Sequence, residues 1–217
     1  MEFEFFKYVE PDVTHRNVRD FKCQLSLRDD VVGFIEYWHY SKNINGIISD
    51  YCFKLECDGE IIGAAIFGRL AMANQWKRFG KQEQDVIELR RLCCVDKTPK
   101  NTESYFIGAM LRWLKKHTQH KVVVSYADME HNHVGTIYKA SNFECLGEQA
   151  GAKVIYWNGK RYHDKAIRTK YNGELKPFAV DLKKAIEDGD AAYKETAGKV
   201  AYFYKLKKEG QECKPNK

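Results

Sequence analysis

The hydrophobic positions along the chain follow two spacings that together predict an α/β fold. Phe106, Met110 and Leu114 recur four residues apart, which is the spacing of one buried face of a helix that residue 101 or 102 can cap. Further helices are predicted over residues 31–40, 133–140 and 180–195. Short apolar runs alternate with the helices and predict strands over residues 51–57, 61–67, 86–95, 122–126, 141–147 and 199–206.

Two dipeptides indicate where neighbouring strands turn back on each other. Asp58-Gly59 separates two apolar runs, and Asn158-Gly159 separates residues 154–157 from residues 161–163. Both dipeptides favour the two-residue turns of β-hairpins, because their residues tolerate positive φ angles. The order of elements therefore predicts a mixed, mostly antiparallel central sheet that is flanked by helices.

Composition favours a globular protein with reduced thiols. The 217 residues are 44% hydrophobic and 30% charged, and no apolar run is long enough to span a membrane. The first residues lack the basic segment of a signal peptide, so we expect a cytoplasmic protein with no membrane partner. The 7 cysteines form no Cys-x-x-Cys pair, which argues against a zinc site.

The positive charge of the chain is concentrated in its last third. Residues 153–217 contain 16 Lys and Arg against 9 Asp and Glu, whereas residues 1–152 contain 20 against 21. A localised basic surface is typical of a polyanion partner, although a solvated lysine-rich face would look the same. Several of these cations interleave with Tyr156, Trp157, Tyr162 and Tyr171, and aromatic rings can stack on bases. The candidate DNA-binding residues are Lys160, Arg161, Lys165, Arg168 and Lys170.

The stretch from residue 125 to residue 138 carries the polar side chains best suited to chemistry. Ser125 and Asp128 end a predicted strand, and Tyr138 lies on the short helix that follows. Ligands bind at the carboxyl ends of strands in open α/β sheets. A carboxylate there can accept a proton, and a phenol can return one to a leaving thiolate. On spacing alone, the alternative stays open that Asp128 caps a helix and Tyr138 is a core aromatic.

Three ordered blocks of the sequence resemble the Mom family of phage DNA-modification proteins. The first reads Ser-Tyr-Ala-Asp at residues 125–128, with His-x-Gly-x-Ile-Tyr-x-Ala and Asn-Phe within residues 133–143. The second reads Glu-Leu-Arg-Arg-Leu at residues 88–92 and continues into a strand-to-helix turn at residues 96–104. The third is His-Tyr-Ser-Lys at residues 39–42.

This resemblance covers roughly residues 30–147. It implies a GNAT-like acyltransferase fold and an enzyme that adds a carbamoylmethyl- or acyl-type group to the N6 amine of adenine in DNA. Such a modification protects phage DNA from restriction in the infected bacterial host. The resemblance places Asp128 and Tyr138 as the acid/base pair, with His133 as an alternative base. The catalytic residues that it implies are His39, Tyr40, Ser125, Asp128, His133 and Tyr138.

A small-molecule group donor, acetyl-CoA or another acyl-CoA, is expected at residues 96–104. The turn there precedes a helix, and a helix N-terminus attracts anions. The turn departs from the GNAT pattern because it contains no glycine, and Asn132 stands where the Mom family commonly has glycine. The expected donor-binding residues are Arg91, Lys97, Lys100, Asn101 and Ser104.

Iron is a further cofactor that the resemblance brings in. Two histidines and one carboxylate can hold iron, and a polar cleft without metal is the alternative. The candidate ligands are His39, Asp128, His131 and His133.

We expect one GNAT-like catalytic domain over residues 1–206, with its core at about 30–147, a C-terminal elaboration at 148–206 and a polar tail at 207–217. The expected macromolecular partner is double-stranded DNA, and a homodimer is one expectation among open oligomeric states. Two alternative functions are compatible with the sequence. One is an acetyl-CoA-dependent N-acetyltransferase acting on a protein or small-molecule amine, and the other is a non-catalytic DNA-binding module of the same fold.

Overall fold

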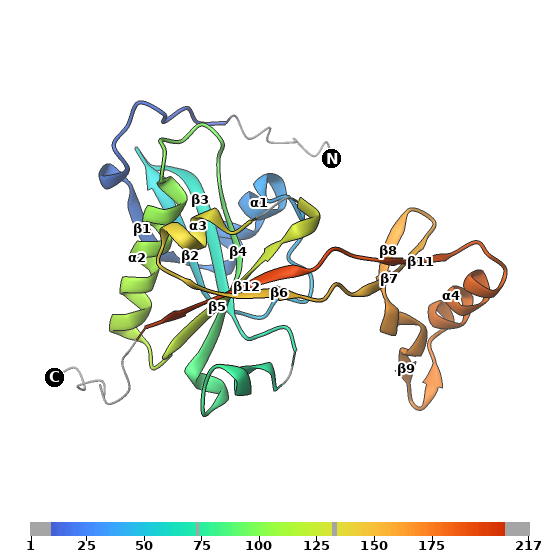
Figure 1. Ribbon diagram of the computed structural model, residues 1–217. Coiled ribbons are helices and arrows are strands. Elements are labelled where there is room, and N and C mark those ends of the chain that lie inside the picture. Colours follow the sequence, from blue (N-terminus) through green and yellow to red (C-terminus); the bar gives the residue numbers. More distant parts are fainter. Residues whose placement is uncertain (1–9, 73, 132–133, 207–217) are drawn as a thin grey trace. The chain divides into compact units, whose positions relative to one another are not determined.

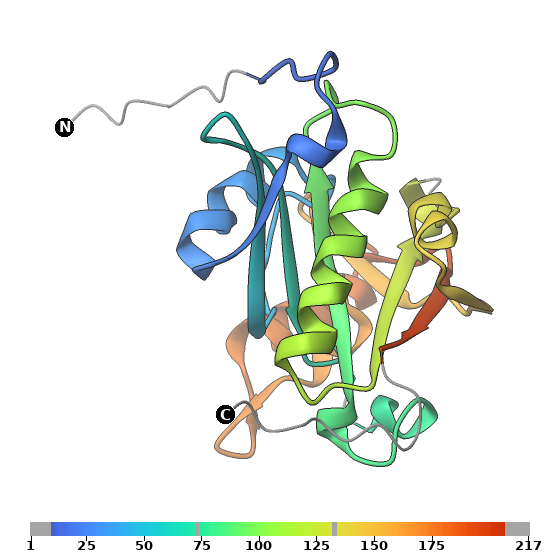
Figure 2. The ribbon, with the colours of Figure 1, turned by 90° about the vertical axis from the view of Figure 1, so that its left-hand side faces the viewer.

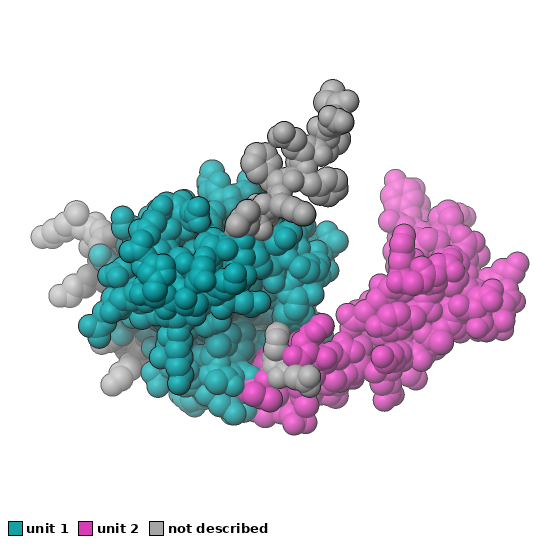
Figure 3. Space-filling model, turned by 90° about the horizontal axis from the view of Figure 1, so that it is seen from above, with its two compact units in different colours: residues 1–126, 135–145, 202–217 teal, residues 127–134, 146–201 magenta. Residues whose placement is uncertain are grey.

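The structure is a computed structural model that describes residues 10–72, 74–131 and 134–206 (Figure 1). By its internal contacts the chain divides into two compact units, which Figure 3 colours separately. Unit 1 comprises Met1–Tyr126, Gly135–Cys145 and Tyr202–Lys217, and unit 2 comprises Ala127–Val134 and Leu146–Ala201. The predicted tail at 207–217 lies outside the described residues. The expected single catalytic domain with an elaboration from residue 148 stays a prediction.

Within the described residues, a seven-stranded sheet has the strand order β1-β2-β3-β4-β5-β12-β6. Its strands are β1 (Lys22–Ser26), β2 (Ser49–Cys57), β3 (Glu60–Gly68), β4 (Val86–Cys94), β5 (Val122–Asp128), β6 (Glu144–Gln149) and β12 (Lys199–Lys205). The pairs β1–β2, β2–β3 and β3–β4 are antiparallel, whereas β4 and β5 are parallel. The predicted fold class, a mixed and mostly antiparallel sheet flanked by helices, is confirmed.

The β2–β3 hairpin forms the centre of the unit 1 core. Asp58 and Gly59 form its turn with φ angles of 51° and 86°, as the sequence predicted from this dipeptide. Phe53 on β2 and Phe67 on β3 are fully buried and meet edge to face, with ring centroids 5.8 Å apart. The neighbouring strand β4 pairs with β3 of this hairpin, so the hairpin positions β4 in the sheet.

Helices pack on the sheet of unit 1. α1 (Arg28–Trp38) contacts β2, β3 and β4, and α2 (Thr102–His117) runs along the sheet (Figure 2). The predicted apolar face of α2 is confirmed, because Phe106, Met110 and Leu114 are all fully buried. None of the helices in the described residues is long and apolar enough to cross a membrane. The short helices of unit 1 are α3 (Thr136–Ala140) and the 3-10 turns η1 (Val18–Asp20), η2 (Gln75–Arg78) and η3 (Glu83–Asp85), whereas η4 (Met129–His131) belongs to unit 2.

Unit 2 combines a small sheet with one helix. Its three-stranded sheet has the order β11-β7-β8, with β7 (Lys153–Trp157), β8 (Lys160–His163) and β11 (Ala192–Glu195). The 3-10 turn η5 (Asp164–Arg168) leads into a two-stranded hairpin of β9 (Lys170–Tyr171) and β10 (Glu174–Leu175), followed by α4 (Pro177–Glu187). Ile155 of β7 packs with Leu182 and Ala185 of α4 in the core of this unit.

The prediction of one helix over residues 180–195 is wrong in its second half. The helix ends at Glu187, and Gly189 follows in the left-handed conformation with φ 83°. A glycine in that conformation ends a helix without steric cost. The last four residues form β11, which pairs antiparallel with β7. The β9–β10 hairpin precedes α4 in the chain, and its Asn172–Gly173 turn also has positive φ angles.

The free cysteines of the described residues include two neighbours on β4, and they yield a testable prediction. Burial raises the pKa of Cys93 to about 12 and raises the pKa of Cys94 well above its usual value. Because the thiolate is the reactive form, both side chains should resist alkylation, whereas exposed Cys145 should react readily. Peptide mass spectrometry after brief iodoacetamide treatment at pH 8 measures this. Labelling of Cys93 and Cys94 as fast as Cys145 in the folded protein would contradict it, and a urea-denatured sample serves as the control.

Candidate functional site

The candidate site in unit 1 lies where β4 and β5 part. Their parallel pairing extends over three register positions and reaches Glu88 opposite Val124. Along β4, the register against β3 shifts between Ile66 and Phe67, so that β4 contains one extra residue there, Arg90. Such a bulge re-aims side chains, and bulges are common beside active sites. The carboxyl ends of parallel strands are also where open sheets bind ligands.

Ser125 and Tyr138 form a hydrogen-bonded pair at this point. The Ser125 hydroxyl is buried and donates to the carbonyl of Leu89 on β4 at 3.1 Å. The Ser125 side chain also hydrogen-bonds the side chain of Tyr138. Burial raises the pKa of Tyr138 to about 12, and the hydrogen bond with Ser125 only partly opposes this. Tyr138 is therefore a neutral phenol at physiological pH and can act as a proton donor.

Gly135 and Tyr202 hold α3 and its tyrosine in place. Gly135 precedes α3 with φ 69°, and its carbonyl accepts from the Tyr138 amide at 3.0 Å. A Cβ at this glycine would lie 2.3 Å from Cζ of Tyr202, so only glycine fits. The Tyr202 ring in turn packs on Tyr138, with centroids 5.1 Å apart. The glycine of the His-x-Gly motif thus has a packing role as well as a conformational one.

His39 and Tyr40 follow the end of α1 in the same unit. His39 is buried, and its Nδ1 accepts the Ser41 amide proton at 3.1 Å and lies 2.8 Å from the Ser41 hydroxyl. Since Nδ1 is an acceptor, the neutral imidazole carries its proton on Nε2. Tyr40 packs on His39 with ring centroids 4.2 Å apart, and it lies close enough to raise the pKa of Tyr138 further.

Glu88 also lies in this region, although it was not among the predicted site residues. Its side chain is buried, and Oε2 accepts from the Ala71 amide and from Arg90 Nη1, each at 3.2 Å. Its charge raises the pKa of Tyr138, which places it close to the Ser125–Tyr138 pair. Glu88 stands between the apolar residues Ile87 and Leu89 of β4, and this was the signal available in the sequence, since burying a carboxylate requires a partner.

Arg91, predicted as a donor-binding residue, also lies in this region. Its Nε donates to the carbonyl of Asn43 at 3.2 Å, and Nη1 donates to the carbonyl of Arg90 at 2.8 Å. Burial lowers the pKa of Arg91, and the neighbouring Tyr40 opposes this. An arginine remains cationic even so. The side chain is therefore fixed by backbone carbonyls near Tyr40, with a charge that suits an anionic ligand.

The turn between β4 and α2 binds the carboxylate of Glu10 from the same chain. The amides of Asp96 and Lys97 donate to Oε1 of Glu10 at 2.9 and 3.2 Å, and Lys97 Nζ lies 3.8 Å from Oε2. Asn101 precedes α2 with φ 73°, and the Ser104 hydroxyl donates to its carbonyl at 3.0 Å. Lys100 beside it is exposed. The turn thus fits a carboxylate or phosphate although it contains no glycine.

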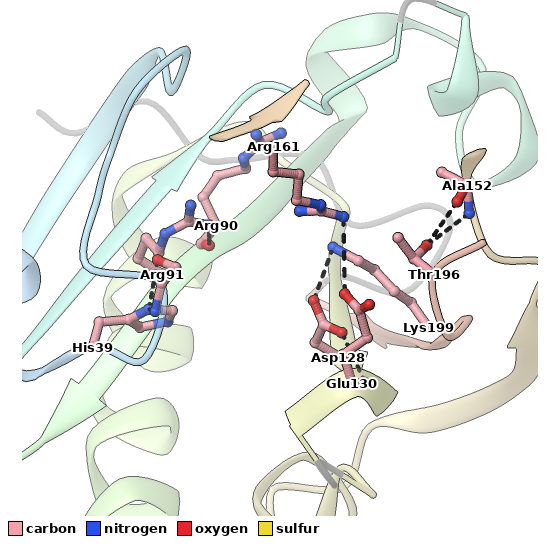
Figure 4. Close-up of polar contacts among 10 residues, drawn as sticks. His39, Arg90, Arg91, Asp128, Glu130, Ala152, Arg161, Thr196 and Lys199 are labelled. Atoms are coloured by element: carbon pink, nitrogen blue, oxygen red, sulfur yellow. Dashed lines mark hydrogen bonds and ion pairs between the residues drawn. The ribbon is translucent and has the colours of Figure 1, made fainter. Parts of the chain in front are cut away.

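Asp128 ends β5 in unit 2, where it makes two polar contacts. Oδ1 accepts from the Glu130 amide at 3.1 Å, so the side chain caps the η4 turn. Oδ2 lies 3.5 Å from Nζ of Lys199, and Figure 4 shows this pair beside that of Glu130 and Arg161. The side chain is largely buried. This contact agrees with the alternative that Asp128 caps a helical turn. The role of Asp128 in acid/base chemistry stays a prediction.

The predicted catalytic and metal-binding residues, together with Arg91, thus fall into three groups. Unit 1 brings together four of them, namely Tyr40, Arg91, Ser125 and Tyr138, with His39 packed on Tyr40. Asp128 and His131 belong to unit 2, and His133 lies outside the described residues. No group of three or more His, Cys, Asp or Glu side chains in the described part of the chain could hold a metal ion.

A family model of the Mom protein family matches residues 21–216. The chain belongs to the Mom protein family. The match covers far more of the chain than the three short motifs, and it includes both units. A comparison with curated proteins gave no match.

Solved structures show that this Mom family member has the GNAT fold. A SpeG spermidine N-acetyltransferase mutant from Vibrio cholerae superposes with a TM-score of 0.50 at 9% identity, covering 87% of this chain and 95% of that one. NAA60 from Arabidopsis thaliana in complex with acetyl-CoA gives 0.50 at 13% identity, covering 85% and 98%. The putative acetyltransferase yncA from Salmonella typhimurium, with its cofactor acetyl-CoA, gives 0.50 at 9%, covering 91% and 99%.

The Mom family match also includes the predicted DNA-binding residues, and all of these lie in unit 2. Each of the five cations has an exposed side chain. Arg161 contacts Glu130 at 3.8 Å, and Arg168 contacts Asp164 at 3.2 Å. Of the four aromatics interleaved with them, Trp157 and Tyr162 pack into the unit 2 core. The other two aromatics, Tyr156 and Tyr171, are exposed.

Gly135→Ala should destabilise this Mom family protein more than an ordinary glycine substitution. The Cβ would collide with Tyr202 and would also impose a left-handed backbone on alanine, which alone costs roughly 1–2 kcal/mol. We expect a loss of at least about 2 kcal/mol, measured by urea denaturation. Gly59→Ala is the matched control, because Gly59 also has positive φ but a Cβ there would meet no other residue within 4 Å. Equal losses in the two variants would show that Tyr202 imposes no constraint.

Proposed function

We propose that this protein transfers a small carbamoylmethyl- or acyl-type group to the N6 amine of adenine in DNA. Membership of the Mom family supports the DNA substrate, and the GNAT fold supports acyl transfer. The observation that carries the proposal is the buried Ser125–Tyr138 pair at the point where β4 and β5 part. A neutral phenol held there is a proton donor, which group transfer to an amine requires for the leaving group.

Two proton transfers accompany the reaction, one to the leaving group and one from the attacking amine, and different residues are proposed for each. Tyr138, with its raised pKa, holds a proton that it can give to a leaving thiolate, while Ser125 keeps the phenol oriented. Asp128 is the proposed acceptor of the proton that the attacking amine loses. Glu88 and Arg90 form an ion pair with little exposure beside this region and fix the shape of the bulge in β4.

An acyl-CoA donor fits the turn at residues 96–104. When bound, it supplies an activated acyl group with a thiolate as leaving group. The Asp96 and Lys97 amides, which hold the Glu10 carboxylate, are the proposed contacts for its pyrophosphate. Lys97, Lys100 and Arg91 add positive charge. Iron stays a prediction, and no step is assigned to it.

DNA is proposed to contact unit 2 through its exposed cations. Neutralising phosphates with lysine and arginine releases counterions and makes binding sensitive to salt. The amine of a paired adenine lies inside the duplex, so the enzyme must take the base out of the stack before it can react. The proposed phosphate contacts are Lys160, Arg161, Lys165, Arg168 and Lys170.

Tyr138→Phe should abolish most modification without unfolding the protein. Removing the proton donor costs general acid catalysis, which typically contributes about 10²–10⁴-fold. Mass spectrometry of nucleosides from plasmid DNA of cells that express each variant measures the modified adenine. The matched control is Tyr204→Phe, which removes a hydroxyl from another tyrosine of the same aromatic cluster, packed on Phe143 at 5.3 Å. Undiminished modification in Tyr138→Phe would refute the assignment, and unmodified DNA with the wild-type protein would refute the proposed function.

Glu10→Ala should strengthen CoA binding. It removes the carboxylate that occupies the Asp96 and Lys97 amides, and we expect roughly three- to tenfold tighter binding because hydrogen bonds to charged groups are the strong ones. Isothermal titration with CoA measures the change. Asp12→Ala removes a nearby negative charge, bonded instead to Thr14, and is the control. The same affinity in both variants would show that the donor does not use these amides.

A further inference from the structure

The three-stranded sheet of unit 2 has two faces with different surroundings. Side chains alternate between the faces along each strand. Ile155 and Trp157 of β7 pack into the core with α4, so their face is the inner one. Residues directly opposite each other in register share a face, so Tyr193 and Tyr162 also belong to the inner face. The outer face carries the side chains in between.

The outer face presents a tyrosine among cations. Tyr156 is 39% exposed and lies directly opposite Arg161 of β8 and Ala192 of β11. Lys194 places its Nζ 5.9 Å from the centroid of the Tyr156 ring. His163 is the remaining polar residue of this face, opposite buried Val154. None of the described outer-face positions of the three strands carries an acidic side chain.

Two carboxylates from outside the strands contact polar residues of this face. Glu130 lies 3.8 Å from Arg161, and Asp164 contacts His163. The Arg161 side chain is 52% exposed, and an exposed pair at that distance contributes little to stability. A phosphate, which accepts charge-assisted hydrogen bonds from arginine, can therefore replace Glu130 at small cost.

We propose that this outer face binds an unpaired segment of DNA, with a base stacked on Tyr156 and the adjoining phosphates on Arg161 and Lys194. The choice of DNA rests on the proposed function. Stacking on an exposed ring needs an exposed base, and a paired base inside a duplex offers none. The platform thus holds nucleotides that have left the duplex, which the modification of an adenine amine would generate.

The inner face offers an internal comparison. Tyr193 there is 43% exposed and also has a lysine over its ring, since Lys153 Nζ lies 5.6 Å from the centroid. However, Lys153 lies directly opposite Glu195, and the neighbouring Ile155 is buried under α4. The two tyrosines match in exposure and in cation contact but differ in their neighbours: Tyr156 lies directly opposite Arg161, whereas the lysine over Tyr193 lies directly opposite Glu195 on the face that packs against α4.

Fluorescence anisotropy with the full chain tests the proposal on three labelled probes: a short single strand, its duplex, and a strand of equal length with abasic sites. The wild type should bind the single strand most tightly. Tyr156→Ala should weaken that binding by roughly 5- to 150-fold and change abasic binding little, since it removes only stacking. Tyr156→Phe, which keeps the ring, and Tyr193→Ala should both bind like the wild type. Thermal melting confirms that each variant is folded.

Several results would overturn the platform. These are unchanged single-strand affinity in Tyr156→Ala, an equal loss in Tyr193→Ala, an equal loss on the abasic strand, or equally tight binding of an acidic peptide by the wild type. The expected pattern in a protein that leaves adenine unmodified would count against the proposed function and would still support the platform.

Discussion

The parallel pairing of β4 with β5 is the constraint on which the site in unit 1 depends. Two parallel strands cannot be joined by a tight turn, so the chain needs a crossover, and α2 provides it. The crossover brings the turn that holds the Glu10 carboxylate to the end of β4, and it brings Ser125 alongside Leu89. Because the pairs β2–β3 and β3–β4 are antiparallel, the parting of β4 and β5 is the position where an open strand end becomes available to a ligand.

A chain of contacts transmits this constraint to Tyr138. Leu89 fixes Ser125, Ser125 bonds Tyr138, and the Tyr202 ring packs against Tyr138 while leaving room only for a glycine at position 135. Each link is short-range and buried, so a shift in one would move the phenol. The burial of Tyr138 disfavours its phenolate form, which explains why the group suits the role of a proton donor and not that of a base.

Local signals in the sequence predicted much of the fold. The Asp58-Gly59 and Asn158-Gly159 turns form as expected, because positive φ is a property of those residues themselves. The apolar face of α2 was also predicted correctly, because its residues recur at helical spacing and are buried. The helix over residues 180–195 was misjudged, because Gly189 ends the helix although apolar spacing continues past it. For the site, the Mom-like motifs indicated Tyr40, Arg91, Ser125 and Tyr138, which the fold brings together. Glu10 could not be predicted, since its contact with residues 96 and 97 joins distant parts of the chain.

The aromatic residues of unit 2 show why composition alone could not define a surface there. Tyr156 and Trp157 are neighbours in sequence, yet the strand pleat sends Trp157 into the core and leaves Tyr156 exposed. The same alternation separates Arg161, opposite Tyr156, from Lys160, opposite Trp157. A basic and aromatic stretch thus divides into a packing face and an outward face once the register is known. The outer face presents fewer cations and aromatic rings than the sequence suggested. However, Tyr156, Arg161 and Lys194 are neighbours there, so a base and its adjoining phosphates can be bound at the same time.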